Sequence, residues 1–392
     1  MKHINLTSEK DCCGCGVCRE VCPVNAITLN VDKTGFYYPV FDDDICIDCG
    51  LCEKKCPVIH SNNIINTKQP SFWGGFNKDE NIRENSSSGG MFSVFAKSVL
   101  QNNGIVVGAV FDREFGVHHV CISTEVELAR IRGSKYVESS LFDVWPVMIS
   151  YLKQGKYLLF SGTPCQIAAA KSICQKWVSQ IVFIEVICFG VPSSLFFRSY
   201  LEWRERKAHV RTIDFKFRCK KYKNDRLREV KTEDVYDTKS LYYDHGRDPY
   251  MKAFYRKLSL RPSCYACRFK GFPRHADITL GDFWGIESLW PEFDHQKGVS
   301  LVIVNTDKGE FLLQQIRDNL SIKEFDKDSA IKKNPMVMES AKVPEKRDNF
   351  WEDFNRMKLK KLFIKYDLMP SFWMRAYNDI RIWGGKIFRI IK

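Results

Sequence analysis

The chain has 392 residues, with 60 Lys and Arg against 47 Asp and Glu, which gives a net charge of +13 at pH 7. Hydrophobic residues make up 44% of it and charged residues 27%, values that are ordinary for a globular protein and exclude a disordered or collagen-like chain. No stretch of about 18 apolar residues occurs, which argues against a membrane-spanning helix. The N-terminal residues lack the apolar run of a signal peptide, so we expect a cytoplasmic protein.

Cysteine is the residue type that departs most from the ordinary. The chain has 16 Cys, and nine of them fall between Cys12 and Cys56. Because thiols stay reduced in the cytosol, we expect these cysteines to bind metal rather than to form disulfides.

Two cysteine runs repeat the same spacing, C-x2-C-x2-C-x3-C-P. This spacing is typical of bacterial two-cluster ferredoxins, in which the fourth cysteine of each run binds the other 4Fe–4S cluster. We therefore predict two clusters; a pair of zinc sites is the alternative, but zinc ligands usually come in pairs. Cys13 is interpreted as a bystander. The predicted ligands are Cys12, Cys15, Cys18 and Cys56 for one cluster, and Cys22, Cys46, Cys49 and Cys52 for the other.

The rest of the chain alternates predicted strands and helices, which favours an α/β body. We predict a ferredoxin-type domain over residues 1–60, closed by a strand near residues 25–29, a polar linker over 61–70 and the body over 71–345. Within the body we expect a helix at Met91–Gln101, a hairpin of strands at Ile105–Phe111 and 117–123, strands at 156–160, 181–188 and 299–305, and helices at 166–173, 194–206 and 310–317.

Four more cysteines occupy expected loop positions: Cys165, Cys188, Cys264 and Cys267. The first two each follow a predicted buried strand, and the last two form a C-x2-C pair. Four thiolates gathered at strand ends can hold a third cluster; a zinc site, a redox dithiol and unrelated buried cysteines are the alternatives. Cys121, Cys174 and Cys219 are interpreted as ordinary cysteines.

The sequence contains no G-x-G-x-x-G fingerprint and no phosphate-binding G-x4-G-K-[ST] loop. The best candidate for an anion site is Ser86–Gly90, where a glycine-rich turn precedes the helix at Met91. A plain serine cap with a glycine turn explains the same residues. The segment 132–136 offers cations and an aromatic ring, and a solvated loop explains it equally well.

An ordered series of motifs nevertheless resembles a known family. The motifs are Ser88–Gly90, 133–136, 160–166, 188–192, 261–267 and 276–285. Together they resemble the coenzyme F420 hydrogenase/dehydrogenase beta-subunit family, here preceded by a two-cluster ferredoxin.

This resemblance implies an FAD-bearing α/β domain that passes electrons between iron–sulfur clusters and a two-electron acceptor, because a flavin can exchange one or two electrons. It also favours the third cluster. The flavin-proximal residues that it implies are Ser88, Gly89, Gly90, Lys135, Tyr136, Thr163 and Pro164.

The C-terminal segment departs from this pattern. Residues 356–392 hold ten Lys and Arg and two Asp, a net charge of +8, with aromatic residues interleaved. We predict a basic amphipathic tail over 346–392, which either lies on an anionic membrane surface or packs on the body with extended Lys and Arg side chains. We expect no nucleic-acid binding, because no recognised binding motif accompanies the charge.

The leading hypothesis is an iron–sulfur flavoprotein oxidoreductase that acts on an organic two-electron substrate together with a redox partner protein. An electron-carrier subunit without its own flavin chemistry is one alternative. A membrane-surface assembly component, of the kind found in polysaccharide synthesis, is the other. The acidic ferredoxin segment, with six Lys and Arg against nine Asp and Glu in residues 1–60, suits docking to a basic surface.

Overall fold

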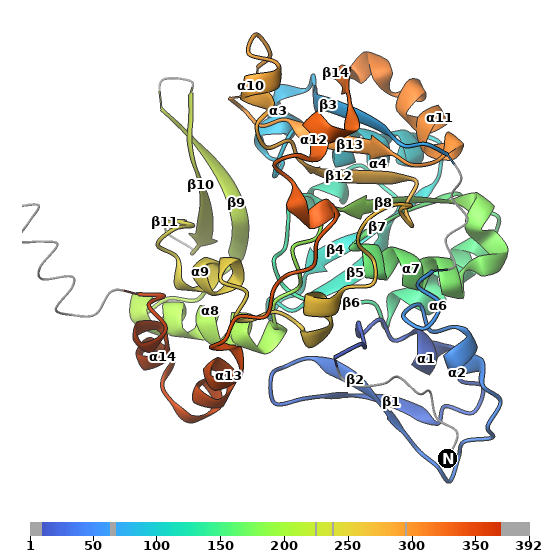
Figure 1. Ribbon diagram of the computed structural model, residues 1–392, viewed down its shortest axis with the longest axis vertical. Coiled ribbons are helices and arrows are strands. Elements are labelled where there is room, and N and C mark those ends of the chain that lie inside the picture. Colours follow the sequence, from blue (N-terminus) through green and yellow to red (C-terminus); the bar gives the residue numbers. More distant parts are fainter. Residues whose placement is uncertain (1–9, 63–67, 224–225, 237–238, 295, 370–392) are drawn as a thin grey trace, which may run out of the picture.

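The computed structural model describes residues 10–62, 68–223, 226–236, 239–294 and 296–369. The ferredoxin part, residues 10–60, forms two short helices and an antiparallel hairpin at one end of the molecule (Figure 1). Its elements are α1 (Val17–Glu20), β1 (Ile27–Val31), β2 (Tyr37–Phe41) and α2 (Leu51–Lys54).

The body is built on a mixed sheet of nine strands in the order β14-β3-β13-β12-β8-β7-β4-β5-β6. The four central strands β12, β8, β7 and β4 are parallel, and most of the outer neighbours are antiparallel. The strands are β3 (Ser71–Asn77), β4 (Ile105–Phe111), β5 (Val117–Ile122), β6 (Ser139–Ser140), β7 (Leu158–Gly162), β8 (Ile181–Val186), β12 (Ile278–Asp282), β13 (Ser300–Val304) and β14 (Leu320–Phe325).

Alternate residues of the central strands are buried on opposite faces of this sheet, as expected for strands covered by helices on both sides. Leu159 packs in the core on the α4 and α11 face, whereas its neighbours Leu158 and Phe160 pack under α6 and α7. The body helices are α3 (Glu80–Glu84), α4 (Met91–Gln101), α5 (Leu128–Ile131), α6 (Val144–Lys153), α7 (Pro164–Ile173), α10 (Ile286–Leu289), α11 (Asp307–Gln315) and α12 (Lys327–Ile331).

A second, smaller sheet and four helices form a lobe beside the large sheet (Figure 1). Its core gathers Phe215 and Phe217 of β9, aromatic residues of α8, and residues from the two last described helices. The lobe consists of α8 (Ser194–Ala208), β9 (Asp214–Lys223), β10 (Arg226–Val235), β11 (Ser240–Asp244), α9 (Pro249–Tyr255), α13 (Arg347–Arg356) and α14 (Leu359–Lys365).

Several predicted elements are observed at or near their predicted bounds. The helix Met91–Gln101 and the strand Ile105–Phe111 coincide with α4 and β4, and β5 pairs with β4 as the predicted hairpin. The α/β body is correct as a class, but the outer strands make the sheet mixed. The β9–β11 sheet was not predicted.

The predicted basic tail is only partly described. In its first part, α13 and α14 bury Phe350, Trp351, Leu362 and Phe363 in the lobe core, which matches the alternative of packing on the body. Residues 370–392 lie outside the described residues. Within the described part of the chain, every helix is too short or too polar to cross a membrane.

Candidate functional site: three groups of cysteines

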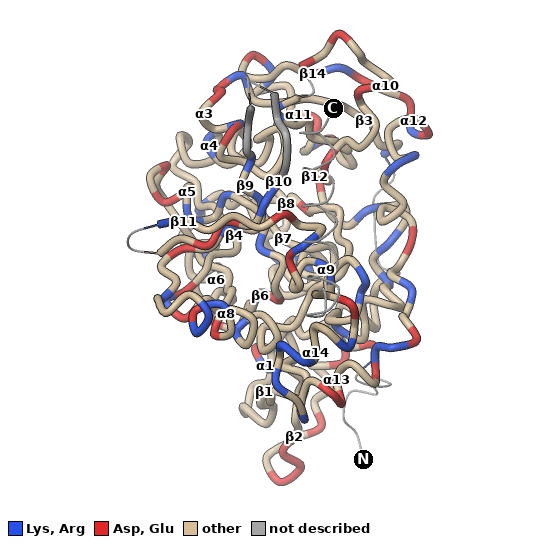
Figure 2. The backbone as a smooth tube through the Cα atoms, turned by 90° about the vertical axis from the view of Figure 1, so that its left-hand side faces the viewer, with Lys and Arg blue, Asp and Glu red and all other residues tan. Residues whose placement is uncertain are grey.

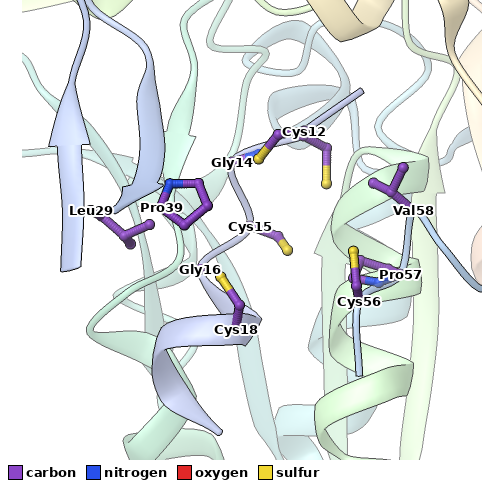
Figure 3. A pocket seen from close by; sticks show the side chains of 11 residues that line it. Cys12, Gly14, Cys15, Gly16, Cys18, Leu29, Pro39, Cys56, Pro57 and Val58 are labelled. Atoms are coloured by element: carbon purple, nitrogen blue, oxygen red, sulfur yellow. The ribbon is translucent and has the colours of Figure 1, made fainter. Parts of the chain in front are cut away.

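One pocket in the ferredoxin part is lined by Cys12, Cys15, Cys18 and Cys56, which we call the proximal site. These are the four cysteines predicted to share a cluster, and Figure 3 shows them arranged around a common space. Gly14 has a φ of +69°, a conformation that favours glycine. Its N–H group donates to the sulfur of Cys12 at 3.4 Å.

The distal site comprises Cys22, Cys46, Cys49 and Cys52, the other predicted quartet. Cys46 and Cys49 lie close enough to Cys52 for their charges to raise its pKa, although burial is the larger cause. Cys22 packs in the same small apolar cluster as Cys52. Its sulfur accepts a hydrogen bond from the N–H group of Ala26 at 3.3 Å. Cys49 is the single exposed residue among the 16 cysteines.

A second pocket is lined by Cys165, Cys188, Cys264 and Cys267, which we call the inner site. Cys165 lies at the start of α7, directly after β7, and Cys188 follows β8. Because β7 and β8 are parallel neighbours, their carboxyl ends meet at one edge of the sheet, where open α/β sheets place their ligands. The other two cysteines come from the 3₁₀ turn Pro262–Ala266 and the residue after it.

N–H groups and cations surround the inner sulfur atoms. Gly190 N–H donates to the sulfur of Cys188 at 3.3 Å, and Val191 N–H donates to that of Cys264 at 3.4 Å. Burial raises the pKa of the Cys188 thiol to about 12, whereas the ammonium of Lys270 acts in the opposite direction. Metal-free thiols here are therefore protonated, and a group that binds thiolates must supply positive charge and displace protons.

The donor set of all three sites fits an iron–sulfur cluster, since it consists of four thiols with N–H groups directed at several of the sulfur atoms. Within the ranges that the structure describes, no three His, Cys, Asp or Glu side chains are placed to hold a single metal ion.

The guanidinium of Arg261 joins the ferredoxin part to the body. Its side chain is 1% exposed. Nε donates to the carbonyl oxygen of Cys12 at 2.8 Å, Nη2 to that of Tyr37 at 2.7 Å, and Nη1 to the carboxylate of Glu138. Burial raises the pKa of Glu138, and Arg261 opposes this shift. Arg261 directly precedes the turn that carries Cys264, so one side chain fixes the inner site against the proximal site.

The residues implied to lie near flavin fall into two neighbouring groups. Ser88, Gly89 and Gly90 lie beside the loop that carries Lys135 and Tyr136, because Ser134 N–H donates to Ser87 Oγ at 2.8 Å. Thr163 and Pro164 instead start α7 at the inner site, where Thr163 Oγ1 lies 3.1 Å from the Cys165 sulfur.

Aromatic rings connect these two groups. Tyr136 packs on Phe254 with ring centroids 5.0 Å apart, and Phe254 packs on Phe189 at 5.1 Å. Phe189 lines the inner pocket. The strand β9 covers the same region, with Arg218 paired to Asp282 at 2.5 Å.

The turn at Ser86–Gly90 does not form the serine cap that was one reading of it. Gly90 is the N-cap of α4, with a φ of +81° and no side-chain cap. Ser88 Oγ donates instead to the carbonyl oxygen of Val299, and Gly89 fits so tightly that an added Cβ would lie 2.5 Å from the carbonyl oxygen of Gly75. The glycines are thus required for packing against β3 and β13.

The ammonium of Lys135 is hydrogen-bonded within its own loop. Its ammonium donates to the carbonyl oxygens of Arg130, Ile131, Arg132 and Gly133 at 3.0–3.3 Å, so it closes the end of α5. Burial lowers its pKa to about 7.

The sequence analysis did not predict that three further residues lie at the cysteine sites. Arg261 and Lys270 lie in the segment around the C-x2-C pair, where a buried arginine cannot be told from a surface one without the fold. Cys13, interpreted as a bystander, lines both the proximal and the inner pocket. Its position directly after Cys12, outside the repeated spacing, was the only available hint.

Comparison with protein families gave three matches. Residues 72–145 match the N-terminal part and residues 155–329 the C-terminal part of the coenzyme F420 hydrogenase/dehydrogenase beta subunit. Residues 11–59 match a 4Fe–4S dicluster domain.

Among solved structures, a chain of the F420-reducing [NiFe] hydrogenase complex from Methanosarcina barkeri is similar, with 16% identity and a TM-score of 0.45. The alignment covers 64% of this chain and 81% of that one. The comparison with curated proteins gave no significant match.

Proposed function

Since the chain belongs to the coenzyme F420 hydrogenase/dehydrogenase beta-subunit family and carries a 4Fe–4S dicluster domain, we propose that it is an iron–sulfur flavoprotein oxidoreductase. It relays electrons between three 4Fe–4S clusters and FAD, and thereby reduces or oxidises an organic two-electron substrate. The three cysteine quartets described above are the proposed ligands.

The observation that carries this proposal is the adjacency of the proximal and inner pockets. The two pockets share Cys13 and Val58 in their linings. Four thiols from three separate segments of the body thus lie directly against a ferredoxin site. Because the proximal and inner pockets share part of their lining, clusters bound in them would be close enough for electron transfer. This role would account for the gathering of four cysteines at the inner site.

The proposed flavin region adjoins the inner site through the rings of Tyr136, Phe254 and Phe189. The N-terminus of α4, which has no side-chain cap at Gly90, would hold the pyrophosphate, because free N–H groups at a helix N-terminus favour an anion. Tyr136 and Thr163 would border the ring system. When bound, FAD supplies the exchange between one-electron and two-electron chemistry. The rings of Phe254 and Phe189 would separate it from the inner cysteines and exclude water.

Iron, sulfide and flavin per chain, measured on protein purified without oxygen, test this function. We expect about twelve iron atoms and one FAD, since each cluster contains four iron atoms. The double variant Cys264→Ser/Cys267→Ser should lose about four iron atoms and keep about eight. The matched control is Cys174→Ser, since Cys174, the C-cap of α7, is buried and lines neither pocket. About eight iron atoms and no flavin in the wild type would instead support the flavin-free electron carrier.

The redox partner would dock at the distal site. The loop Asp42–Leu51 contains four Asp and no Lys or Arg, and Figure 2 shows acidic residues in the loop at the foot of the molecule next to β2. Ile45 and Ile47 are 47% and 61% exposed beside the exposed Cys49. An apolar centre with a charged rim is the usual anatomy of a protein interface, and the acidic rim fits a partner with a basic face.

Electron transfer from the reduced protein to cytochrome c, a basic haem protein used as a probe, tests this docking surface. The rate should fall as salt is raised. The triple variant Asp42→Asn/Asp43→Asn/Asp44→Asn should be slower at low salt and less sensitive to salt. Asp318→Asn, at an exposed position on the body, is the control. Equal rates for the triple variant and the control would rule out this loop as the docking site of the partner.

A further inference from the structure

The segment 334–347, which we call the strap, runs from α12 beside the large sheet to α13 in the lobe (Figure 1). Apart from the 3₁₀ turn Pro335–Val337, it has neither helix nor strand before α13 begins. Val337 is buried in the apolar cluster of β3 and β13, and Ala341 is buried in the core of the lobe. The strap is therefore fixed at two points, and the polar contacts between and beside these points are with residues around the inner cysteines.

Ser340 of the strap is hydrogen-bonded to the backbone of an inner-site ligand. Its Oγ accepts from the N–H group of Cys267 at 3.1 Å and donates to the carbonyl oxygen of the same residue at 3.4 Å. Cys267 directly follows the 3₁₀ turn Pro262–Ala266, where the chain becomes extended. The serine hydroxyl thus holds the residue at which the C-x2-C turn ends.

Arg347, the last residue of the strap, holds the middle and the start of the same turn. Its Nε donates to Tyr265 Oη at 3.1 Å, and its Nη2 donates to the carbonyl oxygen of Leu260 at 3.1 Å. Tyr265 lies between the two cysteines of the C-x2-C pair, and its hydroxyl donates to the carbonyl oxygen of Lys257. The side chain of Arg347 is only 12% exposed.

The strap also reaches the loop that follows β8. Lys270 Nζ donates to the carbonyl oxygen of Met336 in the strap at 2.7 Å and to that of Cys188 at 2.5 Å. The next residue, Gly271, donates its N–H group to the carbonyl oxygen of Val337 at 2.9 Å. Through Lys270 the strap is therefore tied to the Cys188 loop as well as to the C-x2-C turn.

These contacts orient ligands without supplying one. Ser340 and Arg347 bond to backbone atoms and to the Tyr265 hydroxyl. Residues that hold metal ligands in position in this way typically contribute about 10–100-fold to metal affinity. A cluster needs four thiolates directed at one point, so a turn that is free to move would bind it less tightly.

We propose that the strap is a structural part of the inner site, in which Ser340 and Arg347 are positioning residues that hold the C-x2-C turn in the geometry that binds a cluster. The proposal rests on the third cluster of the proposed function. Because the strap continues into α13, whose Phe350 and Trp351 are buried in the lobe core, assembly of the inner cluster depends on the docking of α13 in the lobe.

Titration with an iron chelator, on protein purified without oxygen, tests this role. Ser340→Ala should lose about four iron atoms at a chelator concentration about 10–100-fold lower than the wild type requires. Ser340→Thr keeps the hydroxyl and should restore the resistance of the wild type, and Arg347→Gln should affect the same iron atoms as Ser340→Ala. The matched control is Ser71→Ala, because Ser71 Oγ also accepts from an N–H group, that of the Trp73 ring at 3.0 Å, and lines neither cysteine pocket.

Electron paramagnetic resonance separates positioning from a general loss of stability. The inner-cluster signal is identified as the one that the Cys264→Ser/Cys267→Ser variant lacks. That signal should change in Ser340→Ala and return in Ser340→Thr, whereas the signals of the two ferredoxin clusters should stay the same in both variants.

The possible outcomes separate the two proposals. Iron loss from Ser340→Ala that is spread over all three sites overturns the positioning role. So do a chelator resistance and an inner-cluster signal equal to those of Ser71→Ala. If the wild type itself contains only about eight iron atoms, the third cluster of the proposed function fails and the role of the strap fails with it, and this is visible before any strap variant is made.

Discussion

Replacing Arg261 by glutamine should weaken the contact between the ferredoxin part and the body more than any other single substitution at that contact. The guanidinium is buried and donates to two carbonyl oxygens of the ferredoxin part and to the carboxylate of Glu138. Removing one partner of a buried ion pair leaves an uncompensated charge and costs about 3–5 kcal/mol. The second oxygen of Glu138 has no hydrogen-bond partner, so nothing else is in place to compensate.

Arg268 provides a matched control at the same contact. It forms an ion pair with Asp11 at 3.2 Å, but its side chain is 48% exposed. Exposed pairs of this kind contribute about 0–1 kcal/mol. Anaerobic unfolding in guanidinium chloride, followed by tryptophan fluorescence, should therefore show a loss for Arg261→Gln of about 3–5 kcal/mol and for Arg268→Gln of at most about 1 kcal/mol.

A second substitution and a change of pH isolate the buried charge as the cause. Adding Glu138→Gln to Arg261→Gln should recover part of the loss, because the uncompensated carboxylate is gone. Without Arg261, the pKa of Glu138 in the folded protein should rise further above its unfolded value. A protonated carboxyl then stabilises the variant at low pH, and this stability is lost as pH rises through the folded pKa. The deficit of Arg261→Gln should thus be smaller near pH 5 than at pH 8. A deficit no larger than that of Arg268→Gln, or independent of pH, would refute the reasoning.

Three further substitutions test other parts of the molecule. Burial lowers the pKa of His119 to about 4, so between pH 4 and pH 6.5 only the unfolded state binds a proton at this residue, and the free energy of unfolding should rise by up to about 3 kcal/mol across that range. His119→Gln should remove this rise. Urea titrations at several pH values measure it, with the exposed His60→Gln as control. Gly89→Ala should cost about 1–3 kcal/mol in thermal unfolding, since its Cβ would meet a backbone oxygen of β3 at 2.5 Å, whereas Gly246→Ala should be nearly neutral. Lys135→Met should destabilise even flavin-free protein by about 1–3 kcal/mol, because four carbonyl oxygens lose their donor; unchanged stability without flavin would mean that this lysine serves only a ligand.

The parts of the fold that could be predicted are those with a strong local signal. The helix α4 begins directly after a pair of glycines, and β4 is a continuous run of apolar residues and glycine, so their bounds followed from the sequence. The sheet β9–β11 was missed because its strands are rich in charged residues. In β9, Phe215 and Phe217 do alternate with polar residues, and this period of two was the available signal.

The cysteine sites likewise include features that could be predicted from the sequence and features that could not. The repeated spacing of the two runs suggested which four cysteines share a site, because a tight loop can wrap only its own first three cysteines around one point. Cys165 and Cys188 could be expected near each other since both follow buried strands. That the turn carrying Cys264 reaches the same edge depends on the path of the body chain between α9 and β12, and that Cys13 lies beside it depends on how the ferredoxin part docks. No local pattern encodes that docking.

The charges around the three cysteine sites point to a direction of electron flow. Four Asp lie in the loop around the exposed Cys49 of the distal site, whereas the inner pocket is lined by Lys270, whose ammonium acts to lower the pKa of Cys188. A reduced cluster carries one more negative charge than an oxidised one, so nearby cations raise its potential and nearby carboxylates lower it. We therefore expect the proposed inner cluster to have a higher potential than the distal one, and electrons that enter at the exposed acidic end to move downhill toward the carboxyl edge of the sheet. The same charges attract a basic partner to the end at which the electrons enter, so docking and the direction of transfer have one physical cause.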